Sequence, residues 1–193
     1  MDHTTLIAIV IVVAVIAIAA IGFVVSRKRR SEALRQRFGT EYDRAVLLRG
    51  DAAKAEKELI DRQKRVQSFT IKPLNPTTRD RFRDEWSQIQ NRFVDDPATA
   101  VNQADSLVNR VMAARGYPMS DFEQRAADVS VSYPALVQNY RAACVIVQRF
   151  GRGEAGTEEL RQAMVLYRSL FDELLGASTF VDNRRGVLHE RAS

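Results

Sequence analysis

Apolar residues are continuous near the start of the chain and become periodic further on. The twenty residues from Leu6 to Val25 include no charged or strongly polar side chain. A helix rises about 1.5 Å per residue, so a helix of this length spans the roughly 30 Å hydrocarbon layer of a bilayer. Its backbone groups are hydrogen-bonded within the helix, as a lipid environment requires. The pattern therefore predicts a transmembrane helix over residues 6–25.

The charges on either side of this segment predict its orientation. Residues 1–5 contain Asp2 and no Lys or Arg, whereas RKRR, residues 27–30, follows the apolar run. A cleaved secretory signal has the reverse order, and basic residues stay on the cytoplasmic side. We expect an uncleaved single-pass anchor in the cell (inner or plasma) membrane, with a short extracytoplasmic N-terminus over 1–5 and residues 27–193 in the cytoplasm. A cleaved or inverted segment is the alternative.

The next segment carries a heptad pattern. Apolar residues recur at alternating steps of three and four, with Arg62 as the exception; they are Ala45, Leu48, Ala52, Ala55, Leu59, Val66 and Phe69. We interpret residues 26–69 as a basic juxtamembrane segment and a long stalk helix, weakened at Gly39 and Gly50. Three alanines are small for an intermolecular seam, so the stalk either packs on the protein's own bundle or pairs between copies as a coiled coil and homo-oligomer.

Four further segments show apolar stripes of helical period. The stripes are Phe82, Trp86, Ile89 and Phe93; Val101, Ala104, Val108 and Val111; Leu136, Tyr140, Ala143, Val147 and Phe150; and Leu160, Met164, Tyr167, Phe171 and Leu174. No stretch clearly alternates apolar and polar residues between turn signals. We therefore predict an all-α fold with a bundle of about four helices over 77–175, followed by a flexible tail over 176–193 that lacks periodicity.

Turn and capping residues mark the ends of these helices. FTIKPLNPTT, residues 69–78, contains two prolines that favour extended backbone, and Thr77 or Thr78 can cap the helix after it. Asp95 or Asp96 can cap the next helix, with a proline in its first turn. Thr157 can cap the last one. These signals place the boundary between stalk and bundle within residues 69–78.

The charge balance beyond the apolar segment argues against a nucleic-acid partner. The chain has 29 Lys and Arg against 24 Asp and Glu. Without RKRR and Asp2, 25 basic residues face 23 acidic ones, whereas a DNA-binding domain carries a basic patch. The excess charge lies beside the membrane segment. There, four residues are candidate contacts for anionic lipid headgroups or only determine topology: Arg27, Lys28, Arg29 and Arg30.

No residue pattern indicates catalysis, a metal or a cofactor. GRGEAG, residues 151–156, fits G-x-G-x-x-G, but a dinucleotide site needs a strand that runs directly into the first glycine within a parallel sheet. His3 and His189 lie before the membrane segment and in the tail, too far from a firmly held site to join Cys144 or a serine in a triad. We expect Cys144, within the apolar run ACVIV, to be a small buried hydrophobic residue.

Aromatic residues at helical spacing have two interpretations. A hydrophobic core is the simpler one, and a ligand-binding cavity is the alternative. The residues concerned are Phe82, Trp86, Phe93, Tyr140 and Tyr167.

The stretch ARGYPMSDFEQ, residues 114–124, combines helix-end signals with charge. Gly116 suits a left-handed helix cap, and Ser120 with Glu123 forms a capping box. Arg115 with Asp121, or Asp121 with Arg125, could form an ion pair. Five side chains are not explained by capping, and they either lock the corner or form a partner-binding patch: Arg115, Tyr117, Asp121, Arg125 and Asp128.

Three segments resemble a family of uncharacterised bacterial single-pass membrane-anchored helical proteins. The motifs are R-F-V-D-x-P at Arg92–Pro97, R-G-Y-P-x-x-D-F-x-x-R-A-A-D at Arg115–Asp128, and R-Q-A-M-V-x-Y-R-x-L-F at Arg161–Phe171. The resemblance covers most of residues 36–175. It implies a membrane-anchored helical architecture and no catalytic residues. The family often has a His shortly after the segment matching Arg141–Ala143, where this chain has Cys144, which weakens any role for a histidine there.

These features favour a protein that is not an enzyme. The leading hypothesis is a membrane-tethered interaction or scaffold protein with an unknown protein partner. The alternative is a helical bundle that binds a small ligand or lipid at the membrane surface. A third hypothesis is an enzyme whose catalytic groups are carboxylates alone, and the sequence gives it no positive support.

Overall fold

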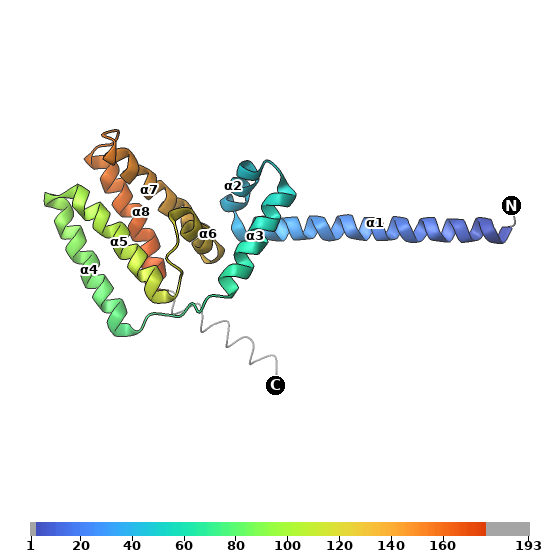
Figure 1. Ribbon diagram of the computed structural model, residues 1–193, viewed down its shortest axis with the longest axis horizontal. Helices are drawn as coiled ribbons and strands as arrows, with labels where there is room; N and C mark the ends of the chain where they lie inside the picture. Colours follow the sequence, from blue (N-terminus) through green and yellow to red (C-terminus); the bar gives the residue numbers. More distant parts are fainter. Residues whose placement is uncertain (1–2, 177–193) are drawn as a thin grey trace. The chain divides into compact units, whose positions relative to one another are not determined.

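The computed structural model of the chain describes residues 3–176 and assigns them to helices and loops without strands (Figure 1). The predicted all-α class is therefore confirmed for this part of the chain. The helices are α1 (His3–Phe38), α2 (Thr40–Arg49), α3 (Ala52–Gln67), α4 (Pro76–Asp95), α5 (Pro97–Arg115), α6 (Phe122–Ser132), α7 (Val137–Gly151) and α8 (Thr157–Gly176). The chain divides into two compact units between Leu59 and Ile60, within α3.

Helix α1 contains the predicted transmembrane segment and continues through RKRR to Phe38 without a break. The side chains of residues 3–12 and of Ala14 lie outside the described part of the structure, as do residues 1–2 and most of the predicted tail. The described large apolar side chains of the segment are exposed: Val13, Val15, Ile16, Ile18, Ile21, Phe23, Val24 and Val25. Among the described residues, no helix is both long and apolar enough to cross a membrane.

The predicted long stalk is three helical pieces rather than one helix. Gly39 and Gly50 have φ angles of 51° and 64°, in the left-handed region that glycine adopts at little cost, and the helix ends at each of them. Because the helix breaks at Gly50, the heptad seam does not continue through it: Leu48 is 64% exposed, whereas Ala45 and Ala55 are buried. The predicted single stalk helix is therefore wrong, and the helix breaks at the two glycines where the sequence indicated weak points.

Polar contacts fold the pieces of the first unit onto one another. The carboxylate of Glu56 in α3 accepts hydrogen bonds from the Tyr42 hydroxyl, at 3.0 Å, and from the Ser31 hydroxyl. The guanidinium of Arg35 lies over the Tyr42 ring, 5.2 Å from its centroid. Phe38, three residues after Arg35 in the sequence, is fully buried. The breaks at the two glycines therefore allow the end of α1, α2 and the start of α3 to pack against one another instead of forming one straight helix.

In the described part of the second unit the bundle has five helices, α4 to α8, where about four were expected, and the short α6 is the additional one. Helix α5 packs against both α4 and α8, α8 also packs against α7, and α6 packs against α7. Figure 1 shows α4 and α5 as an antiparallel hairpin, with α8 running in the same direction as α5. The four predicted stripes supply most of the buried core, and Val101, Ala104, Val108, Val111, Tyr140, Ala143 and Leu170 are fully buried within it.

Helix ends in the bundle confirm some of the predicted caps and correct others. Asp96 caps α5 by accepting a hydrogen bond from the Thr99 backbone nitrogen, at 3.1 Å. Asn75, rather than Thr77 or Thr78, caps α4, with Pro76 in the first turn. Thr157 is the first residue of α8, and Glu159 accepts from the backbone nitrogen of the preceding Gly156, at 2.9 Å. An Asn before a Pro is a better start signal than the threonines that follow.

Gly116 ends α5 as predicted, with a φ of 97°. Its backbone nitrogen donates to the Ala113 carbonyl and that of Tyr117 donates to the Met112 carbonyl, which is the Schellman pattern. A Cβ at Gly116 would lie 2.4 Å from the backbone oxygen of Thr70, in the loop between α3 and α4. Glycine is therefore required here for two reasons, the backbone angle and the close approach of that loop.

We expect Gly116→Ala to destabilise the protein by about 2–4 kcal/mol, because a left-handed alanine is strained and its methyl group overlaps a backbone atom. Gly153→Ala is the matched control: φ is 74°, and no atom lies within 4 Å of the added Cβ. The control should cost only about 1 kcal/mol. Urea denaturation followed by fluorescence of Trp86, the one tryptophan, measures both. Equal losses would contradict the requirement for close packing at Gly116.

Candidate functional site

Arg115, the first of the five predicted corner residues, is buried, with 3% of its surface exposed. Its guanidinium donates to the Tyr133 hydroxyl, at 2.6 Å, and to the backbone carbonyl of Leu174 near the end of α8, at 3.2 Å. Its own carbonyl accepts from the Lys72 backbone nitrogen, at 2.9 Å. The side chain therefore joins the ends of α5 and α8 and is not available to a partner.

The remaining corner residues also make internal contacts. Asp121, and not Ser120, is the N-cap of α6, accepting from the Gln124 backbone nitrogen at 3.0 Å. The Arg125 guanidinium donates to the Ser120 carbonyl. The suggested ion pairs of Asp121 with Arg115 and Arg125 are not seen among the described residues, and one oxygen of its carboxylate accepts the cap hydrogen bond. The predicted capping box is corrected to a cap one residue later.

Asp128 is buried in α6 and receives three hydrogen bonds. Arg65, near the end of α3, donates Nε at 2.8 Å and Nη2 at 2.5 Å to one carboxylate oxygen, and Gln124 donates to the same oxygen at 3.0 Å. Tyr117 is likewise buried, and burial raises the pKa of its hydroxyl. Of the two interpretations that the sequence left open for the five residues, this geometry supports a lock rather than an exposed patch.

A half-buried polar network joins α5, α7 and α8 within the bundle. The Asn109 amide donates to Asp105 at 3.0 Å, and the Tyr140 hydroxyl donates to the Asn109 carbonyl oxygen at 3.1 Å. The Cys144 sulfur lies 3.4 Å from the Tyr167 hydroxyl and 4.0 Å from Asp105. Sequence reasoning missed this network, since its members come from three helices.

Burial dominates the acid–base properties of this network. It raises the pKa of Asp105, although hydrogen bonds from Tyr167 and the nearby charge of Arg125 act in the opposite direction. It also raises the pKa of Cys144 to about 12, so this thiol stays protonated near neutral pH. Cys144 is half-buried with polar neighbours, which corrects the expectation of a simple buried hydrophobic residue. A protonated thiol is a poor nucleophile, so the network is better suited to positioning helices than to catalysis.

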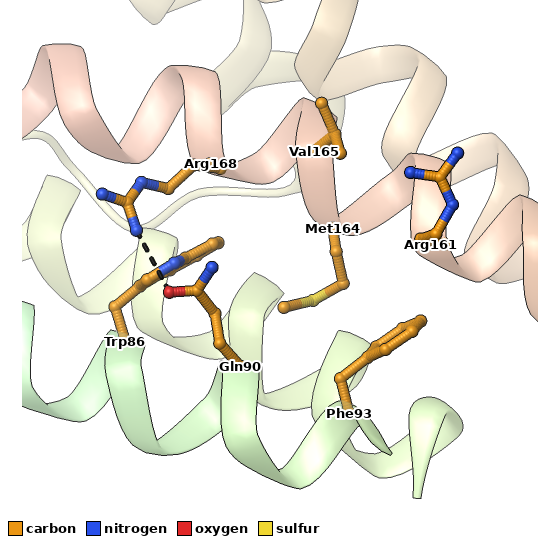
Figure 2. Close-up of a pocket in the computed structure, with 7 residues that line it drawn as sticks. All are labelled: Trp86, Gln90, Phe93, Arg161, Met164, Val165 and Arg168. Carbon is orange, nitrogen blue, oxygen red and sulfur yellow. Dashed lines mark hydrogen bonds between the residues drawn. The ribbon is translucent and has the colours of Figure 1, made fainter.

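A groove of about 260 Å³ lies between α4 and α8. Its walls come from three residues of α4 and four of α8: Trp86, Gln90, Phe93, Arg161, Met164, Val165 and Arg168. Figure 2 shows Met164 pointing from α8 toward α4, between the two arginines. Val165 is 58% exposed at the edge of the groove. The groove therefore presents apolar surface to solvent, with a positive charge at each end.

Arg168 forms a strap over one end of the groove. Its guanidinium lies 5.5 Å from the Trp86 ring centroid, donates to the Gln90 side-chain oxygen at 3.3 Å and pairs with Asp172 at 2.6 Å. Figure 2 shows this side chain reaching across Trp86 to Gln90. These contacts are solvent-exposed, so they contribute little to stability, and Arg168 can replace them with contacts to another molecule at low cost.

Trp86 forms the floor of the groove beneath this strap. Its ring stacks on Phe171 with centroids 4.7 Å apart, and only 1% of its surface is exposed. The indole Nε1–H is buried and has no hydrogen-bond acceptor among the described residues. A buried indole nitrogen usually has a partner, but Arg115 Nε and the Tyr117 hydroxyl also lack one among the described residues, so this donor alone does not indicate a ligand.

The structure also bears on the glycine-rich stretch, on metal sites and on the aromatic residues considered in the sequence. GRGEAG follows the helical α7 and not a strand, so the geometry of a dinucleotide site is absent from this part of the structure. Within the described residues no cluster of His, Cys, Asp and Glu could hold a metal ion. Of the aromatic residues, Trp86 and Phe93 line the groove, whereas Phe82, Tyr140 and Tyr167 belong to the buried core.

The candidate lipid contacts lie in α1 directly after the apolar segment. Arg27, Lys28, Arg29 and Arg30 are all exposed. Successive residues of an α-helix are about 100° apart, so these four side chains surround the helix on every side. The geometry is equally suited to headgroup contacts and to a topology determinant.

The comparisons with known proteins identify no relative. No protein-family model matches the chain, and no curated protein and no solved structure is detectably similar to it. The groove therefore has to be interpreted from its own chemistry.

Asp105→Asn is expected to raise the melting temperature Tm at pH 7. Because the pKa of Asp105 is raised, the native state binds its proton more tightly than the unfolded chain, so the carboxyl stabilises the fold at low pH. That contribution to the free energy of unfolding is lost as the pH rises through the pKa of Asp105 in the folded protein. The amide of Asn does not ionise, so the variant does not lose stability in this way. The gain in Tm should therefore shrink toward about pH 4, near the unfolded pKa.

Calorimetry of both proteins across this pH range measures the effect. Asp84→Asn, at an exposed position of α4, is the control and should show no comparable gain. A lower Tm for Asp105→Asn at pH 7, or a gain that does not change with pH, would contradict the proposed cost of burying this carboxylate.

Proposed function

We propose that the protein is a membrane-tethered, non-enzymatic interaction protein that binds a partner protein at the α4–α8 groove. The observation that carries this proposal is the composition of the groove. Trp, Met and Arg are the residue types enriched at protein interfaces and their energetic hot spots, and here they surround an apolar hollow that is open to solvent. The protonated Cys144 thiol is consistent with a non-enzymatic role.

Helix α1 supports the proposed tether. A row of exposed apolar side chains from Val13 to Val25 has no cover among the described residues, and the ring of basic residues 27–30 follows it directly. Surfaces of this kind are typical of a membrane segment followed by its cytoplasmic flank. We propose a single-pass anchor over residues 6–25 in the cell membrane, with residues 27–193 in the cytoplasm and the basic ring in contact with anionic lipid headgroups. The resemblance to single-pass bacterial membrane proteins is in agreement with this arrangement.

The alternative of a small-ligand or lipid-binding bundle has less support. Sites that enclose small molecules usually have volumes of about 300–1,000 Å³, and they bury most of the ligand. The groove measures about 260 Å³ and is partly open to solvent. A hollow of this size receives one or two side chains of a partner more readily than a whole lipid.

Site-specific photocrosslinking in intact cells tests the proposal. A photoreactive phenylalanine analogue at position 165 should form an adduct with one identifiable protein, because Val165 lies exposed at the groove. Val145 on α7 is the control, since it is 53% exposed and outside the groove, and the same analogue there should not form this adduct.

Two results would contradict the proposal. Adducts with the same proteins at both positions, or with lipid alone at position 165, would exclude a protein-specific groove. Release of the full chain from the membrane by alkaline carbonate would exclude the tether, because an integral helix resists that treatment.

A further inference from the structure

The polar groups of the groove are almost entirely hydrogen-bond donors. Arginine side chains and the indole nitrogen donate and do not accept. The side-chain oxygen of Gln90 is the acceptor among the seven lining residues, and Arg168 already donates to it. None of these seven residues is acidic. Arg161 and Arg168 already pair with Glu158 and Asp172, so a ligand that replaces these partners must bring acceptors of its own, and carboxylates are the side-chain acceptors that best match an arginine fork.

The two arginines have a spacing that defines the shape of such a ligand. Arg161 and Arg168 are seven residues apart on α8, which corresponds to two helical turns and about 10.5 Å along the axis. Met164 and Val165 lie between them in the sequence, and Figure 2 shows the Met164 side chain pointing toward α4. A partner helix that lies along α8 matches this spacing when it has acidic residues at positions i and i+7 and a large apolar residue at i+3 or i+4.

We propose that the groove binds an acidic amphipathic helix of the partner protein. Two of its carboxylates, two turns apart, pair with Arg161 and Arg168. A large apolar side chain between them enters the groove against Phe93 and Met164. This inference rests on the function proposed above and specifies the chemistry of its partner.

The present contacts of the arginines do not prevent this exchange. Arg161 pairs with Glu158 on its own helix, at 2.6 Å, and Arg168 with Asp172. The four side chains are between 44% and 74% exposed, and exposed pairs of this kind contribute little. A carboxylate brought by a docked helix pairs in a partly desolvated interface, where the same attraction is stronger. If Arg168 turns toward that carboxylate, its hydrogen bond to Gln90 is released.

Binding can be followed through Trp86, because the chain has one tryptophan and it lies in the groove. The full chain is reconstituted in phosphatidylcholine nanodiscs and titrated with helical peptides that lack Trp and Tyr. The test peptide has Glu at positions 1 and 8 and Leu at positions 4 and 5. One control peptide has Lys in place of both Glu residues, and another has Ala in place of both Leu residues. Decanoate, an acyl chain with a carboxylate and no peptide, is a separate arm.

The test peptide should change the Trp86 fluorescence and saturate, with each control peptide binding at least about tenfold more weakly. Arg161→Glu with Arg168→Glu should weaken the Glu peptide by at least about tenfold and strengthen the Lys peptide. This reversal also shows that the double variant is folded. Arg152→Glu, at an exposed arginine paired with Glu154 outside the groove, is the matched control and should leave both peptides unchanged.

Three results would overturn the acidic-helix inference: equal affinity for the Glu and Lys peptides, no saturable change with the Glu peptide, or saturation by decanoate but not by the peptides. They are distinguishable from failure of the proposed function. A protein adduct specific to position 165, found together with any of these results, leaves the groove as a partner site and excludes only this partner chemistry.

Discussion

The bundle depends on one buried cation, the guanidinium of Arg115. Helices α5 and α8 run in the same direction, so their carboxyl ends meet, and each end carries the negative end of a helix dipole. Arg115 closes α5 and donates to the Leu174 carbonyl at the end of α8 and to Tyr133 between α6 and α7. Burying a cation is costly unless it is compensated, and here Nη1 of Arg115 is compensated by the Leu174 carbonyl at the end of α8 and by the Tyr133 hydroxyl. The loop from α3 is held at the same place through Lys72.

The groove follows from that arrangement. Helix α5 packs against α4 and α8, so these two helices lie on either side of it and their side chains meet over it. The stacked pair Trp86 and Phe171 fills the space at one end. Further along, Met164 and Phe93 leave an open hollow, bounded by arginines that the core does not need. Residues 115–128 and the groove therefore have different roles: the first holds the helices in place, and the second is the surface that this placement leaves exposed.

Periodicity was sufficient to predict the class of fold and most of its core. The stripes that include Trp86, Val108 and Leu174 are buried as expected, and Gly116 and Asp96 end and begin helices as expected. Local patterns failed where contacts are long-range or where neighbouring residues compete for one role. Arg65 and Asp128 are paired although they are 63 residues apart. Asp121, and not its neighbour Ser120, is the N-cap of α6, although both residue types are suitable caps. The groove was missed because Arg161 and Arg168 resemble ordinary exposed residues until α4 is placed opposite them. Their spacing of two turns around Met164 and Val165 was the available signal.

The most direct test of this account is native-state hydrogen exchange of Arg115→Met, compared with Arg110→Met, an exposed arginine of the same helix that pairs with Glu85. If Arg115 joins the two helix ends, its loss should reduce amide protection in the last turns of both α5 and α8, by about 2–4 kcal/mol in the opening free energy. Arg110→Met should leave α8 unchanged. Loss of protection confined to α5, or the same pattern in both variants, would contradict the central role of Arg115.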